Sequence, residues 1–179
     1  MITAVVCAAF DAATDEAVLA TRDILATLGV RLAEHPAHRP HLTLAAARIE
    51  PDELPSVLHS AATVAARHRR ITITLAEVGR FDGSGVIWLG PRPSAELTGL
   101  QRDVDGVLLG AGWPRAFGQR SDPAQWTPHC TLAVRVPPPR LPAVLAALRA
   151  HYRPVEARIE GLATILVGGR GDVGYTPLG

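Results

Sequence analysis

Residues 40–45 read Pro-His-Leu-Thr-Leu-Ala, and residues 128–133 read Pro-His-Cys-Thr-Leu-Ala. The two stretches agree at five of six positions, and the second histidine, His129, lies 88 residues after the first, His41. A single His-x-Thr match arises easily by chance in a chain with seven histidines. Two matched copies instead indicate an internal duplication, in which each copy contributes one imidazole and one hydroxyl.

Both copies read as strands, in which successive side chains point to opposite faces. The histidine and the threonine of each copy therefore share a face, with apolar residues behind them. Ala45 is expected on that face in the first copy, and Ala133 and Arg135 in the second. If a pseudo-twofold axis brings the two strands side by side, two imidazoles and two hydroxyls converge on one small volume.

Hydrophobic periodicity predicts the same order of elements around each motif. Strands are expected over residues 4–10, 41–47, 71–78, 86–90, 129–136, 155–167 and 173–178, and helices over 11–28, 51–67, 94–109 and within 141–151. The spacing from His41 to Trp88 nearly equals that from His129 to Tyr175. Trp88 and Tyr175 are therefore expected at corresponding points of the two repeats.

This repetition predicts an α+β fold built from duplicated β-α-β-α-β units. Neither half carries enough elements to close its own core, so the halves are expected to pack as one body. The chain would be a single domain over residues 1–179, with pseudo-symmetric halves of approximately 1–85 and 86–179. Its bilobal shape would place antiparallel sheets around a central cleft.

Composition limits the classes of partner. The formal net charge is +1, with all 18 basic residues arginine, so no long-range attraction to nucleic acid or to an anionic membrane is expected. Any phosphate recognition must be local. No apolar stretch approaches the length of a membrane span, which predicts a cytoplasmic protein without a membrane partner. Cys7 and Cys130 have no zinc or disulfide spacing and are expected to be buried free thiols.

A facing pair of histidines suits phosphodiester chemistry without a metal. One neutral ring can take a proton from water while a protonated ring gives one to the leaving oxygen, because imidazole titrates near neutral pH. Threonine hydroxyls can donate hydrogen bonds to the non-bridging oxygens. His35 and His38 raise the alternative of a metal site, but no carboxylate or cysteine completes a ligand set there, so neither metal nor cofactor is expected.

At this point the chain resembles a known family, the two-histidine (2H) phosphoesterases, and within it the 2'-5' RNA ligase-like, RNA 2',3'-cyclic phosphodiesterase branch. The resemblance rests on His41 and Thr43, on His129 and Thr131, on the turn at 79–81 and on the strand at 86–90. It implies a bilobal fold with both motifs on central strands. It also implies an enzyme that opens a cyclic phosphate, usually 2',3'-cyclic, on an RNA terminus or a small nucleotide to give the 2'-phosphate, with reversible 2'-5' joining in some members.

The same resemblance implies roles for individual residues. His41 and His129 would be the acid and the base, with His129 favoured as the base for water, and Thr43 and Thr131 would bind the phosphate. A basic residue often follows the second motif in this branch, and Arg135 is the candidate here.

Other residues are candidates for substrate contact, each with a structural alternative. Trp88 and Tyr175 could stack on a nucleobase or pack in the core, and Phe81 could contact a base or anchor a turn. Arg120 lies in the long loop before the second motif, where a substrate role competes with simple solvation.

Two rival functions stay open. The same site could act on another cyclic phosphate or on a 2'-5' linked oligonucleotide, or the chain could be a module that binds a nucleotide end without turnover. Two titratable rings favour an enzyme, because a binding module does not need them. No feature indicates an obligate protein partner.

Overall fold

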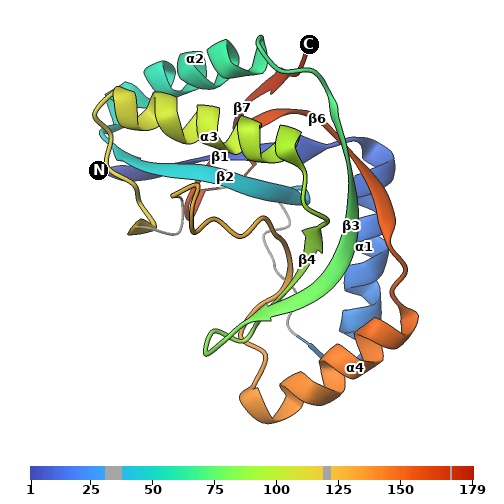
Figure 1. Cartoon of the computed structure of the whole chain (residues 1–179). Helices are drawn as coiled ribbons and strands as arrows, with labels where there is room; N and C mark the ends of the chain where they lie inside the picture. Colours follow the sequence, from blue (N-terminus) through green and yellow to red (C-terminus); the bar gives the residue numbers. More distant parts are fainter. Residues whose placement is uncertain (31–37, 119–121, 170) are drawn as a thin grey trace.

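The computed structural model describes residues 1–30, 38–118, 122–169 and 171–179 (Figure 1). Its strands are β1 Ile2–Phe10, β2 His41–Ile49, β3 Ile71–Phe81, β4 Val86–Pro91, β5 Cys130–Ala133, β6 Val155–Leu166 and β7 Asp172–Pro177. Its α-helices are α1 Ala12–Thr27, α2 Leu54–Ala65, α3 Ala95–Gly110 and α4 Leu141–His151, with short 3₁₀ turns at Pro51–Glu53 and Pro138–Arg140. All the predicted strands and helices are present, although β5 is about half as long as expected.

The strands form one antiparallel sheet in the order β2-β1-β6-β3-β4-β5, with β7 also paired to β6. This order is symmetric about its centre when β1 corresponds to β4, β2 to β5 and β6 to β3. The long strand β6 pairs with β3 along residues 155–159 and with β1 along residues 159–166. The sheet is therefore continuous through both lobes, and each lobe contains strands from both halves of the sequence (Figure 1).

The helices also pack against strands from the opposite half of the sequence. Helix α3, from the second half, packs against β2 and α2, whereas α1, from the first half, packs against β5 and α4. Figure 1 shows α2 and α3 together over the upper lobe and α1 and α4 together at the lower lobe. The predicted duplicated, pseudo-twofold α+β architecture is confirmed, and its two units are intertwined.

Helices α1 and α3 are equivalent in detail. Asp11 caps α1 by accepting a hydrogen bond from the backbone N–H of Thr14, and Ser94 caps α3 by accepting one from Leu97. Each such cap stabilises a helix by about 1 kcal/mol. The buried positions recur with the same spacing of 83 residues that separates the caps: Thr14, Val18, Thr21 and Leu25 in α1, and Leu97, Gln101, Val104 and Leu108 in α3.

The main core lies between the sheet and the helices. Fully buried side chains such as Phe10, Leu42, Leu75 and Leu100 belong to it, and burying each contributes roughly 1.5–3 kcal/mol. A smaller apolar cluster of Val5, Cys7, Ala46 and Ile165 occupies the opposite face of β1, β2 and β6.

Both cysteines, Cys7 and Cys130, are buried free thiols, as expected from the sequence. No helix among the described residues is both long and apolar enough to cross a bilayer.

Candidate active site

A β-bulge follows the threonine in both copies of the motif. The register between β1 and β2 shifts at Leu44, and the register between β4 and β5 shifts at Leu132. In each strand the extra residue is the leucine directly after the motif threonine. Bulges redirect the side chains that follow them and are common beside active sites. The duplication therefore extends to a local distortion of the backbone.

Because of the β-bulges, part of the prediction about which side chains share a face of the strand is wrong. Ala45 and Ala133 lie in the main core together with the leucines that precede them, not on the face of the histidines. An extra residue in a strand reverses the two-residue period beyond it, so the prediction fails from the bulge onward. Arg135 lies beyond the end of β5, exposed and in a left-handed conformation with φ of 56°. It does not share the face of Thr131.

The two motif histidines have the same hydrogen bond. Nδ1 of His41 lies 2.8 Å from the carbonyl oxygen of Arg39, and Nδ1 of His129 lies 2.8 Å from that of Thr127. A carbonyl oxygen only accepts, so Nδ1 must carry the hydrogen in both rings. Each neutral ring therefore keeps an unprotonated Nε2. This arrangement orients the ring and leaves one nitrogen for proton transfer.

Burial lowers the pKa of both rings below the ordinary value. For His41 desolvation is the largest cause, the bond to the Arg39 carbonyl opposes it, and the electrostatic interactions with His38 and Arg22 lower the pKa further. For His129 desolvation again lowers the pKa, and the bond to the Thr127 carbonyl opposes it. Both shifts favour the neutral form of the ring.

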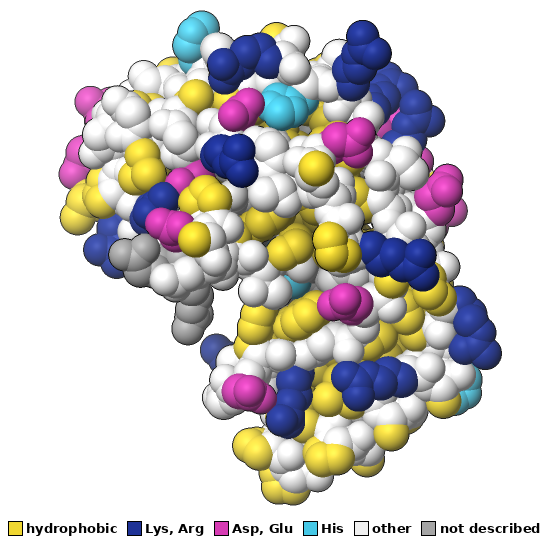
Figure 2. Space-filling view, viewed as in Figure 1, with side chains coloured by type: hydrophobic (Ala, Val, Ile, Leu, Met, Phe, Trp, Pro, Cys, Tyr) yellow, Lys and Arg dark blue, Asp and Glu magenta, His cyan; other side chains and the backbone are white. Residues whose placement is uncertain are grey.

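The two motif strands meet although they are far apart in the hydrogen-bonded order. β2 and β5 stand at its two ends, so the expectation of central strands is wrong, yet the strands are in contact. The backbone of His41 interacts with the thiol of Cys130, the residue next to His129. The curvature of the sheet brings the ends of the order together, and Figure 2 shows the molecule hollowed between the two lobes.

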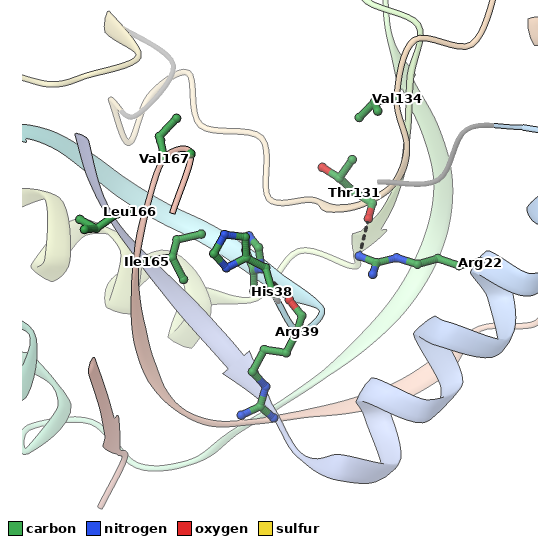
Figure 3. A pocket seen from close by; sticks show the side chains of 10 residues that line it. Arg22, His38, Arg39, Thr131, Val134, Ile165, Leu166 and Val167 are labelled. Carbon is green, nitrogen blue, oxygen red and sulfur yellow. Dashed lines mark hydrogen bonds between the residues drawn. The ribbon is translucent and has the colours of Figure 1, made fainter. Parts of the chain in front are cut away.

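A cavity of about 280 Å³ opens where the two strands meet (Figure 3). Its lining consists of Arg22, His38, Arg39, His41, Thr131, Val134 and residues 165–168. The cavity thus brings together the histidine of the first motif and the threonine of the second. Thr43 and His129 belong to the same two motifs but do not line the cavity.

The carbonyl oxygen of each motif threonine is held by a side chain from the other half of the chain. Trp126 donates its indole N–H to Thr43 O at 3.0 Å, and Arg22 donates from Nη2 to Thr131 O at 2.9 Å. These carbonyls lie beside the bulges, where regular pairing stops. Trp126 and Arg22 therefore have the same structural role in the two lobes.

Aromatic side chains surround His129. The ring of Phe81 meets the imidazole edge to face at 4.7 Å, and the ring of Trp88 lies 6.4 Å from it. Trp88 lies flat on β3, so closely that a Cβ on Gly79 would come within 2.2 Å of its ring. This aromatic wall is composed of two of the residues that the sequence suggested for base contact.

Tyr175 lies elsewhere. It is 47% exposed on β7, opposite Ala163, with its ring over Gly161. The expected correspondence with Trp88 is wrong, because Trp88 faces the motif threonine Thr131 while Cys7 faces Thr43 in the other lobe. β7 has no counterpart in the symmetric strand order. Arg120 and His35 lie outside the described residues.

Arg22, Arg39 and His38 line the cavity although their sequence pattern did not predict it. Arg39 is neutralised there by an ion pair with Asp15 and also donates to the carbonyl of Phe10. Among the residues that the structure describes, no group of three or more His, Cys, Asp or Glu side chains is placed to hold a metal ion. Arg22 could have been noticed only by aligning α1 with α3, since nothing local distinguishes it from a surface arginine.

The chain matches the model of the 2'-5' RNA ligase superfamily over residues 14–170, and it belongs to that superfamily of 2H phosphoesterases. The resemblance stated from the paired motifs is thereby confirmed. No curated protein matches the chain.

Solved structures share the fold at low identity. E. coli LigT in apo form is 20% identical with a TM-score of 0.66, covering 99% of this chain and 95% of that one. The protein TT0787 of Thermus thermophilus is 16% identical with a TM-score of 0.68, covering 99% and 98%. The MHV ns2 PDE domain is 16% identical with a TM-score of 0.52, covering 75% and 84%. LigT has been crystallised with 3'-AMP, with ATP and with phosphate.

Proposed function

We propose that this phosphoesterase-superfamily protein is a metal-independent phosphodiesterase that opens a 2',3'-cyclic phosphate on an RNA end or a small nucleotide. The observation that carries the proposal is the pair of matched Nδ1–carbonyl bonds. They leave one Nε2 at the start of β2 and one directly before β5, and these two strands are in contact. Two such nitrogens supply both proton transfers that the reaction needs.

In the proposed reaction His129 acts as the base and His41 as the acid. Nε2 of His129 takes a proton from water, the water oxygen forms a bond to phosphorus, and the bond from phosphorus to O3' breaks. Protonated His41 gives its proton to O3', so the product is a 2'-phosphate with a free 3'-hydroxyl. The same sequence, with a 5'-hydroxyl in place of water, would make a 2'-5' linkage.

The hydroxyls of Thr43 and Thr131 are proposed to bind the non-bridging oxygens, where negative charge increases in the transition state. The wall formed by Phe81 and Trp88 offers an apolar surface beside His129 on which a nucleobase could stack, at about 1–3 kcal/mol per base. The LigT complexes with 3'-AMP and ATP support nucleotides as the ligand class. A cytoplasmic location remains part of this proposal.

Turnover in excess chelator tests the proposal. Purified protein is incubated with a 2',3'-cyclic nucleotide and with a short RNA that ends in a cyclic phosphate, and the products are identified by ³¹P NMR. We expect hydrolysis to the 2'-phosphate, and rates lower by at least about 10²-fold in His41→Gln and in His129→Gln. His59→Gln, on the outer helix α2, is the matched control. Wild-type rates in both site variants would refute the assignment.

The salt dependence of binding separates a small nucleotide from RNA. The net charge of +1 predicts that few phosphates are engaged, so log K should fall with log salt by a slope of magnitude about 1–2 even for an RNA ligand. A slope several times steeper would favour an extended RNA site. Tight binding of a cyclic-ended RNA with no hydrolysis would favour a binding module instead.

A further inference from the structure

Arg22 differs from the other cation that lines the cavity. It reaches the cavity from α1, and its Nη2 bonds the backbone carbonyl of Thr131 (Figure 3). Its Nε is buried and has no hydrogen-bond partner among the described residues. Within the described part of the chain no carboxylate forms a salt bridge with it. By contrast, Arg39 is paired with Asp15, and Figure 3 shows its guanidinium directed away from Arg22.

The pseudo-symmetry gives no counterpart for the charge of this guanidinium. With α1 and α3 aligned at their caps, Arg22 corresponds to Asp105. Asp105 is 3% exposed and bonded to Arg115, which closes the outer edge of β2 through a bridge to Ala47. The lobe of the first motif therefore has a closed ion pair where the lobe of the second motif has a guanidinium with no salt bridge among the described residues. The carboxylate that interacts with it electrostatically, that of Asp15, is already paired with Arg39.

The hydrogen bond that Arg22 makes does not require a charge either. In the other lobe the equivalent carbonyl, that of Thr43, is satisfied by the neutral indole of Trp126. A half-buried guanidinium without a salt bridge is costly, because desolvation penalises a charge that is only partly compensated. An anion that enters the cavity would compensate it, and guanidinium nitrogens match phosphate oxygens well.

We propose that Arg22 is an anion-binding residue of the active site, where it holds a non-bridging oxygen of the scissile phosphate between His41 and Thr131. This inference rests on the proposed function and deepens it, by adding a fixed positive charge to the neutral and titratable donors of the two motifs. One arginine from the first half of the chain thus completes the phosphate site formed with the second motif.

The charge of Arg22 also acts on the proposed acid. The charged and titratable groups that interact electrostatically with His41 are His38 and Arg22, which lower its pKa, and Asp172 of β7, which raises it. A nearby cation makes the protonated ring a stronger acid towards the leaving oxygen. Replacing Arg22 with a neutral residue should raise the pKa of His41, so the alkaline limb of the pH–rate profile should move to higher pH.

The experiment compares Arg22→Gln and Arg22→Lys with Arg102→Gln, a control on the exposed side of α3. Glutamine can still donate to the Thr131 carbonyl but carries no charge. We expect kcat for a 2',3'-cyclic nucleotide to fall by about 10²-fold in Arg22→Gln, with partial recovery in Arg22→Lys and no change in Arg102→Gln. The thermal midpoint of unfolding, measured alongside, reports any loss of fold.

Calorimetric binding of inorganic phosphate, measured without turnover, separates the two proposals. One possible result is that Arg22→Gln binds phosphate about ten-fold more weakly than the wild type, while the wild type hydrolyses no cyclic phosphate. This result would support the anion site and refute the proposed function. The opposite result is a wild type that turns over the cyclic nucleotide and an Arg22→Gln variant with the same kcat, the same alkaline limb of the pH–rate profile and the same phosphate affinity. This result would overturn the inference and leave the proposed function standing. Failure of the wild type to bind phosphate would overturn the inference as well.

Discussion

The two motif histidines share a hydrogen-bond pattern but have different neighbours. His41 lies near the side chains of Arg22 and His38, whereas His129 packs beside the rings of Phe81 and Trp88. Identical motifs thus have unequal electrostatic surroundings. This inequality suits the proposed division of roles, in which His41 gives a proton and His129 takes one from water.

The lowered pKa of both rings sets the pH range of activity. In the proposed mechanism the productive form has one protonated and one neutral ring, and its population is greatest between the two pKa values. Because both pKa values lie below 6.5, we expect kcat/KM for a cyclic nucleotide to follow a bell-shaped curve with its maximum on the acidic side of pH 6.5. Measuring initial rates from pH 4.5 to about 9 at constant ionic strength checks this. A maximum above pH 8 would contradict it.

The proposed phosphate contact of the threonine hydroxyls can be tested with substitutions that keep the shape of the side chain. Thr43→Val and Thr131→Val remove a donor but keep a β-branched side chain that suits a strand. We expect each to lower kcat by roughly 10²-fold with little change in the free energy of unfolding. Thr72→Val, on the exposed face of β3, is the matched control and should keep full activity. Unchanged kcat in both site variants would remove the phosphate contact from the proposal.

At the residue scale the sequence is informative where chemistry repeats. Two copies of His-x-Thr identify four candidate residues because imidazole and hydroxyl groups are matched in kind and in spacing. Arg22 carries no such signal, since a lone helical arginine gives no sign of which element its helix will cover. Its place depends on α1 packing against β5, which is a long-range contact.

Among the elements, the motif strands β2 and β5 carry the least predictable features. Their existence follows from periodicity, but a bulge depends on how a strand pairs with its neighbour, and the sequence of one strand does not state this. Leucine after the motif threonine reads as an ordinary buried position in both copies. The bulges at Leu44 and Leu132, and the early end of β5, appear only once β1 and β4 are in place.

Strand β2 should depend on the indole that holds its carbonyl. Trp126→Phe keeps an aromatic ring but leaves the Thr43 oxygen without its donor, which costs about 1–3 kcal/mol of unfolding free energy for a buried acceptor. We expect that loss in urea denaturation, together with a lower kcat/KM because Thr43 is displaced. Trp113→Phe is the control, since its indole bonds the solvated carboxylate of Glu53 and its loss should leave activity unchanged. Equal effects of the two substitutions would contradict this role.

The whole molecule is symmetric in a way that makes its halves interdependent. The palindromic strand order places β6 between β1 and β3, so the centre of the sheet is made by strands from both halves. The sequence predicts the duplication, because repeated spacings are visible along the chain. It does not predict the exchange of α1 and α3 between lobes, since periodicity shows which face of a helix is buried but not which strand covers it.

This interdependence can be tested by cutting the chain in the exposed turn between β3 and β4. Residues 1–85 alone would keep the pairing of β1 with β2 but leave α1 without β5 and β3 without either of its partners. We therefore expect neither 1–85 nor 86–179 to give dispersed NMR spectra or cooperative unfolding by itself. An equimolar mixture should recover both properties and part of any phosphodiesterase activity, because the cut removes no paired residue. Cooperative unfolding of either fragment alone would show that the halves are separate folding units and that their exchange is not required for stability.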